Sequence, residues 1–279
     1  MITLPAGTVA WVTGAARGLG WGIARAFGRA GARVCVTDIT EAELARCGAD
    51  LQADGAAFIT CASDVSDPEA CAEVAGRVVA RWGRLDVVVH NAIYMPLQPF
   101  AATAPEEWNR QLAVGLGGMY NCARAAWPQM TAQGGGHLMG VASGSSLRGY
   151  KDEVAYCTIK HGIEGFVKAL ALEARPHNVA VNTIGPGTRI KPTRITWDEY
   201  DHAPEDLRAT WADPVELGMA WVWLAAQPPA RLSGYRLDAA PLLRTIAREG
   251  SDFAFSPEKV TLYPDDFRAR EEWYRTYPE

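Results

Sequence analysis

Two residues with complementary chemistry, Tyr156 and Lys160, stand four positions apart in a segment with helical periodicity. Residues four apart lie on one face of a helix, so the phenol and the ammonium group can enter the same pocket. A phenol is a poor base near neutral pH because its pKa is about 10. A cation about 4 Å away stabilises the phenolate by roughly 4 kcal/mol, which would lower the tyrosine pKa by about three. The pair predicts proton transfer; the alternative is a solvated pair on a helix surface.

A glycine-rich turn near the N-terminus has the spacing of a phosphate-binding site. Residues 8–13 form an apolar run typical of a buried parallel strand, and helix-like sequence follows up to Ala30. Gly14, Gly18 and Gly20 lie between the two. They let backbone N–H groups approach a pyrophosphate at the helix N-terminus, where the helix dipole favours anions. This position predicts a dinucleotide site; the alternative is a tight turn without a ligand.

One acidic residue indicates which dinucleotide is bound. Asp38 ends the second predicted strand, 18 residues after Gly20. A carboxylate there accepts hydrogen bonds from both ribose hydroxyls of an adenosine and repels a 2′-phosphate, so the sequence favours NAD over NADP. Arg17 is the opposing signal, because a guanidinium in the turn can pair with a 2′-phosphate. Asp38 also suits the N-cap of a helix over 41–53, and the two roles are compatible.

Short apolar runs alternate with helix-like segments along the chain. This alternation predicts an α/β fold, a Rossmann-type doubly wound parallel sheet in three α/β/α layers, with ligands beyond the carboxyl ends of the strands. The further strands are predicted at 57–60, 85–89, 137–143, 179–184 and 235–238. The further helices are predicted at 41–53, 68–82, 105–130 and 214–226, and the helix that carries Tyr156 and Lys160 is predicted to end at about Ala174.

Length and composition set the limits of the function. The chain has 279 residues and a formal charge of −5, and we expect a single catalytic domain over 1–240 with an extension over 241–279. Without a block of Lys and Arg, nucleic acid is not expected as a partner. No window reaches the roughly 20 apolar residues that a membrane span needs. The six cysteines never form Cys-x-x-Cys, which indicates reduced thiols, no metal site and a cytoplasmic location.

Together these motifs resemble the short-chain dehydrogenase/reductase family, in its compact single-domain branch. The matching residues, spread over roughly 5–240, are Thr13-Gly14-x-x-x-Gly18-x-Gly20, Asp64, Asn91-Ala92, Ser143, Tyr156-x-x-x-Lys160 and Asn182-x-Ile184-x-Pro186-Gly187. The resemblance implies that Tyr156 acts as general acid or base and that Lys160 lowers its pKa and binds the nicotinamide ribose. Ser143 would hydrogen-bond the substrate oxygen.

The resemblance implies an oxidoreductase that transfers hydride between a nicotinamide cofactor, NAD rather than NADP, and a secondary alcohol or ketone. Two alternatives stay open: an enzyme of this fold diverted to dehydration or isomerisation, and a cofactor-binding scaffold without catalysis. The residues expected to hold the cofactor are Gly14, Arg17, Gly18, Leu19, Gly20, Asp38, Asp64, Val65, Asn91, Ala92, Tyr156, Lys160, Pro186, Gly187 and Thr188.

The sequence departs from the family pattern in three places. Gly115 stands where the family usually has an Asn for a water-mediated proton relay, and a water is expected to fill the room that glycine leaves. Ile93 replaces a glycine after Asn91-Ala92, and Ala239-Ala240 replaces two glycines after the last strand. Glycines inside a helix are costly, so Gly115 and its neighbours at 117 and 118 predict close packing against a second subunit or the cofactor.

We expect a small-molecule substrate with an apolar or aromatic body. The cations near its pocket would either bind a carboxylate or phosphate or be solvated loop charges. The 241–279 extension is rich in aromatic residues and is expected to pack on its own or a neighbouring subunit, over the mouth of the site. The family resemblance also implies a homo-oligomer, a dimer or tetramer. The predicted pocket wall comprises Tyr94, Met95, Leu147, Arg148, Tyr150, Lys151 and the irregular segment 189–211.

Overall fold

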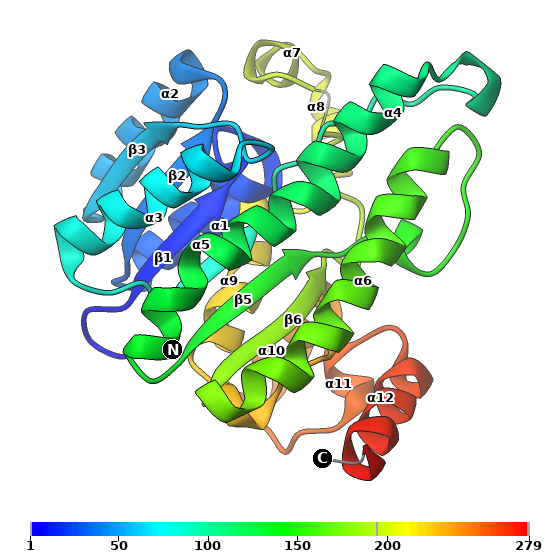
Figure 1. The fold of residues 1–279 in the computed structure, drawn as a ribbon. Helices are drawn as coiled ribbons and strands as arrows, with labels where there is room; N and C mark the ends of the chain where they lie inside the picture. The colour runs from blue at the N-terminus through cyan, green and yellow to red at the C-terminus, as the bar shows by residue number, and fades with distance from the viewer. Residues whose placement is uncertain (1, 194, 278–279) are drawn as a thin grey trace.

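A single parallel sheet of seven strands organises the chain in the computed structural model, which describes residues 2–193 and 195–277. The strand order is β3-β2-β1-β4-β5-β6-β7, so the direction of winding reverses between β1 and β4 (Figure 1). The predicted doubly wound sheet is confirmed. The strands are β1 (Val9–Thr13), β2 (Arg33–Asp38), β3 (Phe58–Ala62), β4 (Val87–His90), β5 (Gly136–Val141), β6 (Val179–Gly185) and β7 (Arg236–Asp238).

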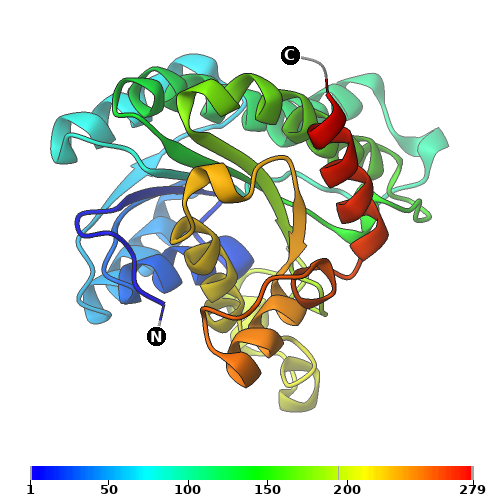
Figure 2. The same cartoon turned by 90° about the horizontal axis from the view of Figure 1, so that it is seen from below.

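Helices cover both faces of this sheet. Side chains alternate along β1, so Ala10 and Val12 enter one core while Val9 and Trp11 enter the other. Burial on both faces explains why the central strands are continuous apolar runs. The first core packs against α1 (Gly18–Arg29), α2 (Glu41–Ala53), α9 (Pro214–Ala225) and α10 (Ala239–Glu249); the second packs against α3 (Pro68–Trp82), α5 (Gly118–Ala132) and α6 (Val154–Ala174) (Figure 2).

Two helices begin at an aspartate followed by proline. Asp67 accepts hydrogen bonds from the backbone N–H groups of residues 69 and 70 at the start of α3, and Asp213 does the same for residues 215 and 216 of α9. The carboxylate satisfies N–H groups that have no partner in the first turn, and proline fits the first helical position because it lacks an N–H group. Local sequence therefore sets where these helices start.

The predicted long helix over 105–130 is divided into two α-helices by a π-helical turn. α4 (Pro105–Leu112) leads into the turn at Ala113–Gly117, and α5 follows. A Cβ atom on Gly115 would lie 2.6 Å from Ile159 Cγ2 and 2.9 Å from Ile93 Cδ1. A Cβ atom on Gly118 would lie 2.8 Å from Val65 Cγ2. At Gly115 and Gly118 the close neighbours are thus side chains of the same chain, and the packing of a second subunit or the cofactor against this turn stays a prediction.

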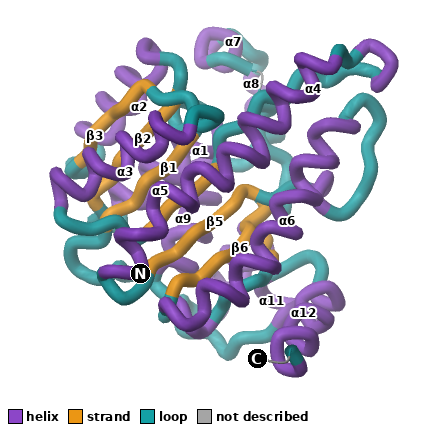
Figure 3. The backbone as a smooth tube through the Cα atoms, in the orientation of Figure 1, coloured by secondary structure: helices purple, strands orange, loops and turns teal. Residues whose placement is uncertain are grey.

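Two segments lie outside the regular alternation of strands and helices. The segment after β6 contains two short helices, α7 (Trp197–Asp201) and α8 (Glu205–Arg208), joined by loops (Figure 3). The C-terminal extension continues from α10 into α11 (Pro257–Val260) and α12 (Pro264–Thr276). Its Phe267 and Tyr274 are buried against the rest of this chain, whereas Trp273 and Tyr277 are exposed.

No helix in the described ranges has both the length and the apolar character needed to cross a bilayer.

The glycines of the π-helical turn give a matched test of this packing. Gly115→Ala should lower the free energy of unfolding by about 1–3 kcal/mol, because the new methyl group collides with Ile159 and Ile93. Gly117→Ala is the control: the nearest atom to its added Cβ is Leu112 O at 3.6 Å, so it should raise stability by about 0.5–1 kcal/mol. Urea denaturation of both variants measures the difference, and equal effects would refute the packing account.

Candidate functional site

A cavity of about 880 Å³ lies where β1, β4, β5 and β6 end. Its lining comes from segments distant in sequence, including the glycine-rich turn, the start of α6 and the loop after β6. Gly20 is not part of the lining. The predicted site residues that border the cavity are Gly14, Arg17, Gly18, Leu19, Asp38, Asp64, Val65, Asn91, Ala92, Ser143, Tyr156, Lys160, Pro186, Gly187 and Thr188.

The glycine-rich turn is held in place by Asn91. Gly14 and Gly18 have φ values of +59° and +60°, in the left-handed region that favours glycine. The Asn91 side-chain amide donates hydrogen bonds to Gly14 O (2.8 Å) and Thr13 O (3.1 Å). A Cβ atom on Gly20 would lie 2.3 Å from Gly14 O, so this third glycine serves the close packing of the turn rather than the cavity surface.

An acidic group marks the end of β2. Asp38 accepts hydrogen bonds from the backbone N–H groups of Ala16, Ile39 and Thr40, which fix its carboxylate at the cavity edge. Burial raises its pKa, and these three hydrogen bonds oppose that effect. Arg17 borders the cavity as well, but its guanidinium pairs with Glu43 at 3.0 Å. The cation of the turn is thus partly neutralised by a nearby carboxylate.

Two other predicted binding segments also have defined backbone positions. Asp64 accepts hydrogen bonds from the Ser66 N–H and hydroxyl groups, and Val65 O accepts one from the Asn121 amide. After β6, Gly187 has a φ of +65°, and Pro186 O accepts a hydrogen bond from Ala240 N. These contacts fix both loops at the cavity edge.

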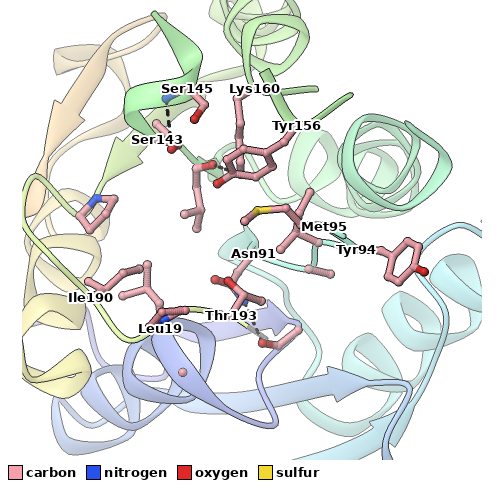
Figure 4. A pocket seen from close by; sticks show the side chains of 18 of the residues that line it. Leu19, Asn91, Tyr94, Met95, Ser143, Ser145, Tyr156, Lys160, Ile190 and Thr193 are labelled. Atoms are coloured by element: carbon pink, nitrogen blue, oxygen red, sulfur yellow. Dashed lines mark hydrogen bonds between the residues drawn. The ribbon is translucent and has the colours of Figure 1, made fainter. Parts of the chain in front are cut away.

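Ser143, Tyr156 and Lys160 converge on one side of the cavity (Figure 4). Ser143 follows β5 and caps a 3₁₀ turn at Gly144–Ser146, and Tyr156 and Lys160 project from successive turns of α6. The Ser143 side chain lies beside Tyr156, where it acts to lower the tyrosine pKa. The Lys160 Nζ atom lies 5.5 Å from the centre of the Tyr156 ring and donates a hydrogen bond to Val141 O at 2.6 Å.

The protonation energetics differ from the sequence-based expectation. Burial raises the pKa of Tyr156, and Ser143 only partly offsets this. The expected lowering of this pKa by Lys160 is wrong, because Lys160 is not among the groups that shift it and its ammonium is directed at a backbone carbonyl. Burial also lowers the pKa of Lys160, to about 8, with Glu164 opposing the effect and Arg236 adding to it. Both groups are therefore biased towards their neutral forms.

The space beside Gly115 is lined by apolar side chains. Ile93 and Ile159 fill the space beside this glycine, closer than a Cβ atom would tolerate. The Gly115 carbonyl is instead a hydrogen-bond partner of His90 Nε2, at 2.8 Å. Burial lowers the pKa of His90 to about 4, so this histidine is neutral near pH 7 and joins β4 to the π-helical turn. Apolar side chains therefore pack against the position at which the family pattern implies a water-mediated relay.

The predicted pocket wall is correct in part. Tyr94, Met95 and Tyr150 border the cavity, whereas Leu147, Arg148 and Lys151 do not. The last two are exposed because the loop after the 3₁₀ turn runs outward. Of the segment 189–211, the described residues 189–193 reach the main cavity, and Trp197, Tyr200 and Trp211 instead border a smaller one of about 300 Å³ together with Trp21.

Sequence reasoning missed several residues that border the cavity. Glu153 lies one turn before Tyr156 and accepts a hydrogen bond from Ser145 Oγ at 2.7 Å, a neighbour that helical spacing could have identified. Arg236, Leu262 and Tyr263 also border the cavity. They come from the last strand and the extension, and no local spacing links them to the other site residues.

Comparison with known proteins identifies the family of this chain. Residues 8–202 match the family model described as short chain dehydrogenase. The chain is 34% identical to the D-threitol dehydrogenase of Mycolicibacterium smegmatis, over 82% of this chain and 89% of that protein. It is 35% identical to the L-fucose dehydrogenase of Oryctolagus cuniculus, over 80% of each. A metagenomic short-chain oxidoreductase crystallised with NADP superposes with a TM-score of 0.71 at 31% identity, covering 83% of this chain and 97% of that one.

The Asn91 contacts lead to a testable prediction. Asn91→Asp replaces an amide donor by a carboxylate facing two carbonyl oxygens, so it should lower the free energy of unfolding by about 1–3 kcal/mol. Asn109→Asp is the control, since Asn109 is exposed on α4 and the same chemical change should have little effect there. Thermal unfolding of both variants measures the contrast, and an unchanged transition for Asn91→Asp would show that the turn does not depend on this amide.

Proposed function

Since the chain belongs to the short-chain dehydrogenases, we propose that Tyr156 is the proton-transferring group of an NAD-dependent enzyme that interconverts secondary alcohols and ketones. The observation that carries this proposal is the convergence of Ser143, Tyr156 and Lys160 on a cavity that the glycine-rich turn also borders. Dehydrogenation of an alcohol needs both a proton acceptor and a bound hydride acceptor, and this one cavity brings the two requirements together.

The residues present fit a dinucleotide. Open space lies beside Gly18, where an added Cβ atom would meet no atom within 4 Å, and the N-terminus of α1 follows directly. Such a turn suits a pyrophosphate, because free N–H groups and the helix dipole both favour an anion. Asp38 would hold the adenosine ribose, and Lys160 the nicotinamide ribose. The loop at Pro186–Thr188 would border the nicotinamide, which when bound supplies the hydride acceptor or donor.

We place NAD ahead of NADP. The Asp38 carboxylate is fixed at the end of β2, and Glu43 adds a second negative charge nearby. Arg17 pairs with Glu43, so this cation is not free to attract a 2′-phosphate. Two carboxylates and one neutralised guanidinium favour an unmodified ribose. The related metagenomic structure holds NADP, which makes this preference worth a direct measurement.

The protein's own groups would manage the proton. In alcohol oxidation, Tyr156 in its phenolate form takes the hydroxyl proton while the carbinol hydrogen leaves with its electron pair as hydride. In ketone reduction, the neutral phenol returns the proton to the oxygen. Ser143 donates a hydrogen bond to that oxygen. Because burial raises the pKa of Tyr156, the neutral phenol prevails near pH 7, so oxidation should become faster as the pH rises.

The cavity wall indicates the substrate class. Apolar side chains of Ile93, Met95, Val114 and Leu262 border the cavity, which supports a substrate with an apolar or aromatic body. We also infer a cytoplasmic homo-oligomer, a dimer or tetramer. The exposed Tyr120 on α5 and Val154 on α6 support an interface on this face of the molecule.

Removal of one hydroxyl tests the catalytic proposal. Tyr156→Phe should abolish alcohol-dependent NAD reduction, with a loss of at least about 100-fold, since general acid–base catalysis commonly contributes that much. The variant should still bind NADH, because the glycine-rich turn is unchanged. Tyr277→Phe, at an exposed tyrosine near the C-terminus, should keep full activity. Absorbance at the NADH wavelength follows turnover across a panel of secondary alcohols; retained activity in Tyr156→Phe would refute the proposal.

A second variant tests the choice of dinucleotide. Asp38→Ala removes the carboxylate that faces the adenosine ribose, so the ratio of kcat/KM for NADP to that for NAD should rise by at least about tenfold, equal to about 1.4 kcal/mol. Asp50→Ala, on α2 outside the cavity lining, serves as a control for charge alone. Unchanged selectivity in Asp38→Ala would contradict the assigned role.

A further inference from the structure

A buried ion network lies one helical turn beyond Lys160. Glu164 is four residues after Lys160 on α6 and is 4% exposed. One of its carboxylate oxygens accepts hydrogen bonds from Thr183 Oγ1 at 3.0 Å and from Arg236 Nη1 at 3.3 Å. The other accepts a hydrogen bond from Arg270 Nη2 at 2.9 Å. The carboxylate thus joins α6 to the sheet and to the C-terminal extension.

Arg270 is a buried cation of the extension. It is 4% exposed on α12, pairs with Asp266 at 2.7 Å and donates a hydrogen bond to Gly234 O at 3.2 Å. Tyr274, one turn further on, donates a hydrogen bond that connects α12 to Gly234 O or Lys168 O. Figure 2 shows α12 standing at the edge of the sheet and reaching the layer that contains α6. Buried charges interact more strongly than surface pairs, because little water screens them.

We propose that Glu164 is a positioning residue for Lys160 and that Arg270 limits the effect of the Glu164 charge by pairing with it, so that α12 acts on the site from outside the cavity. This inference rests on the proposed role of Lys160. The carboxylate lies about 6 Å further along the helix axis, within the range of a strong charge interaction in a buried region.

Among the charged groups near Lys160, Glu164 provides the negative charge that favours its ammonium form, and Asp238 is paired with Arg236 at 3.3 Å. Tyr156 lies on the same helix, His90 faces it from the end of β4, and Arg236 from β7. Tyr156 and His90 are neutral near pH 7, and Arg236 is a cation. Glu164 therefore favours the ammonium form of Lys160, whereas Arg236 disfavours it. Arg270 reduces the field of Glu164 by sharing its carboxylate.

Removing Glu164 and removing Arg270 should shift the pH at which Lys160 loses its proton in opposite directions. Glu164→Gln removes the negative charge, so Lys160 should lose its proton at a pH lower by roughly one unit. Arg270→Gln removes a positive charge from the network, so the proton should be retained to a higher pH. Pulse acetylation of the full-length protein at a series of pH values is read by mass spectrometry at Lys160. It gives, for each variant and without any need for turnover, the midpoint, which is the pH at which half of the Lys160 side chains have lost their proton. Lys160 borders the cavity, which gives the reagent access.

Two control variants separate charge from docking. Tyr274→Phe weakens the attachment of α12 without changing any charge, and Arg268→Gln removes an exposed arginine from the same helix. Both should leave the Lys160 midpoint unchanged. Arg270→Lys keeps the charge and should restore the wild-type value. The pH profile of kcat/KM should follow the labelling results, with its alkaline limb moving in the direction of each midpoint.

Opposite shifts for Glu164→Gln and Arg270→Gln, with neither control moving, would support the inference. No shift, or shifts in the same direction, would overturn it, as would an equal shift in Tyr274→Phe. If Glu164→Gln does not fold, as judged by circular dichroism, Arg270→Gln decides alone. The proposed function fails separately: activity that survives Tyr156→Phe would refute it whatever the labelling shows at Lys160.

Discussion

The contact between Asn91 and the glycine-rich turn is the constraint on which the cavity depends. It joins the ends of β1 and β4, the two strands between which the winding of the sheet reverses. At such a point the connections leave in opposite directions and a crevice opens beyond the strands. A side-chain amide that donates to two carbonyls keeps the turn close to β4. Gly14 and Gly20 make the approach sterically feasible.

Much of this arrangement could be predicted from the sequence, because its signals are local. The strands bury both faces and appear as apolar runs, and Asp38, Asn91 and Ser143 each follow such a run directly. The contributions of Arg236, Leu262 and Tyr263 could not be predicted, since only the three-dimensional fold brings them to the cavity. The hydrogen bond from the Lys160 ammonium to a backbone carbonyl could not be predicted from the sequence either. Residue spacing fixes the face of a helix on which a residue lies but not its hydrogen-bond partner.

Burial and charge compete at the centre of the site. Desolvation opposes both the phenolate of Tyr156 and the ammonium of Lys160, whereas the proposed chemistry requires each of them at some stage. The protein offsets part of this cost through Ser143 at one group and Glu164 at the other. The charges that act on Lys160 come from α6 and β7, and Glu164 is in turn paired with Arg270 of the extension.

The contact of Gly115 with Ile93 and Ile159 links two departures from the family pattern, the glycine at position 115 and the isoleucine at position 93. Ile93 occupies the volume beside Gly115 that a longer side chain on the π-helical turn would need. A relative that carries asparagine at the position of Gly115 must carry a smaller residue at that of Ile93, or a displaced helix. These positions should therefore covary among homologues, and an engineer who wishes to introduce the asparagine would have to redesign all three residues at once.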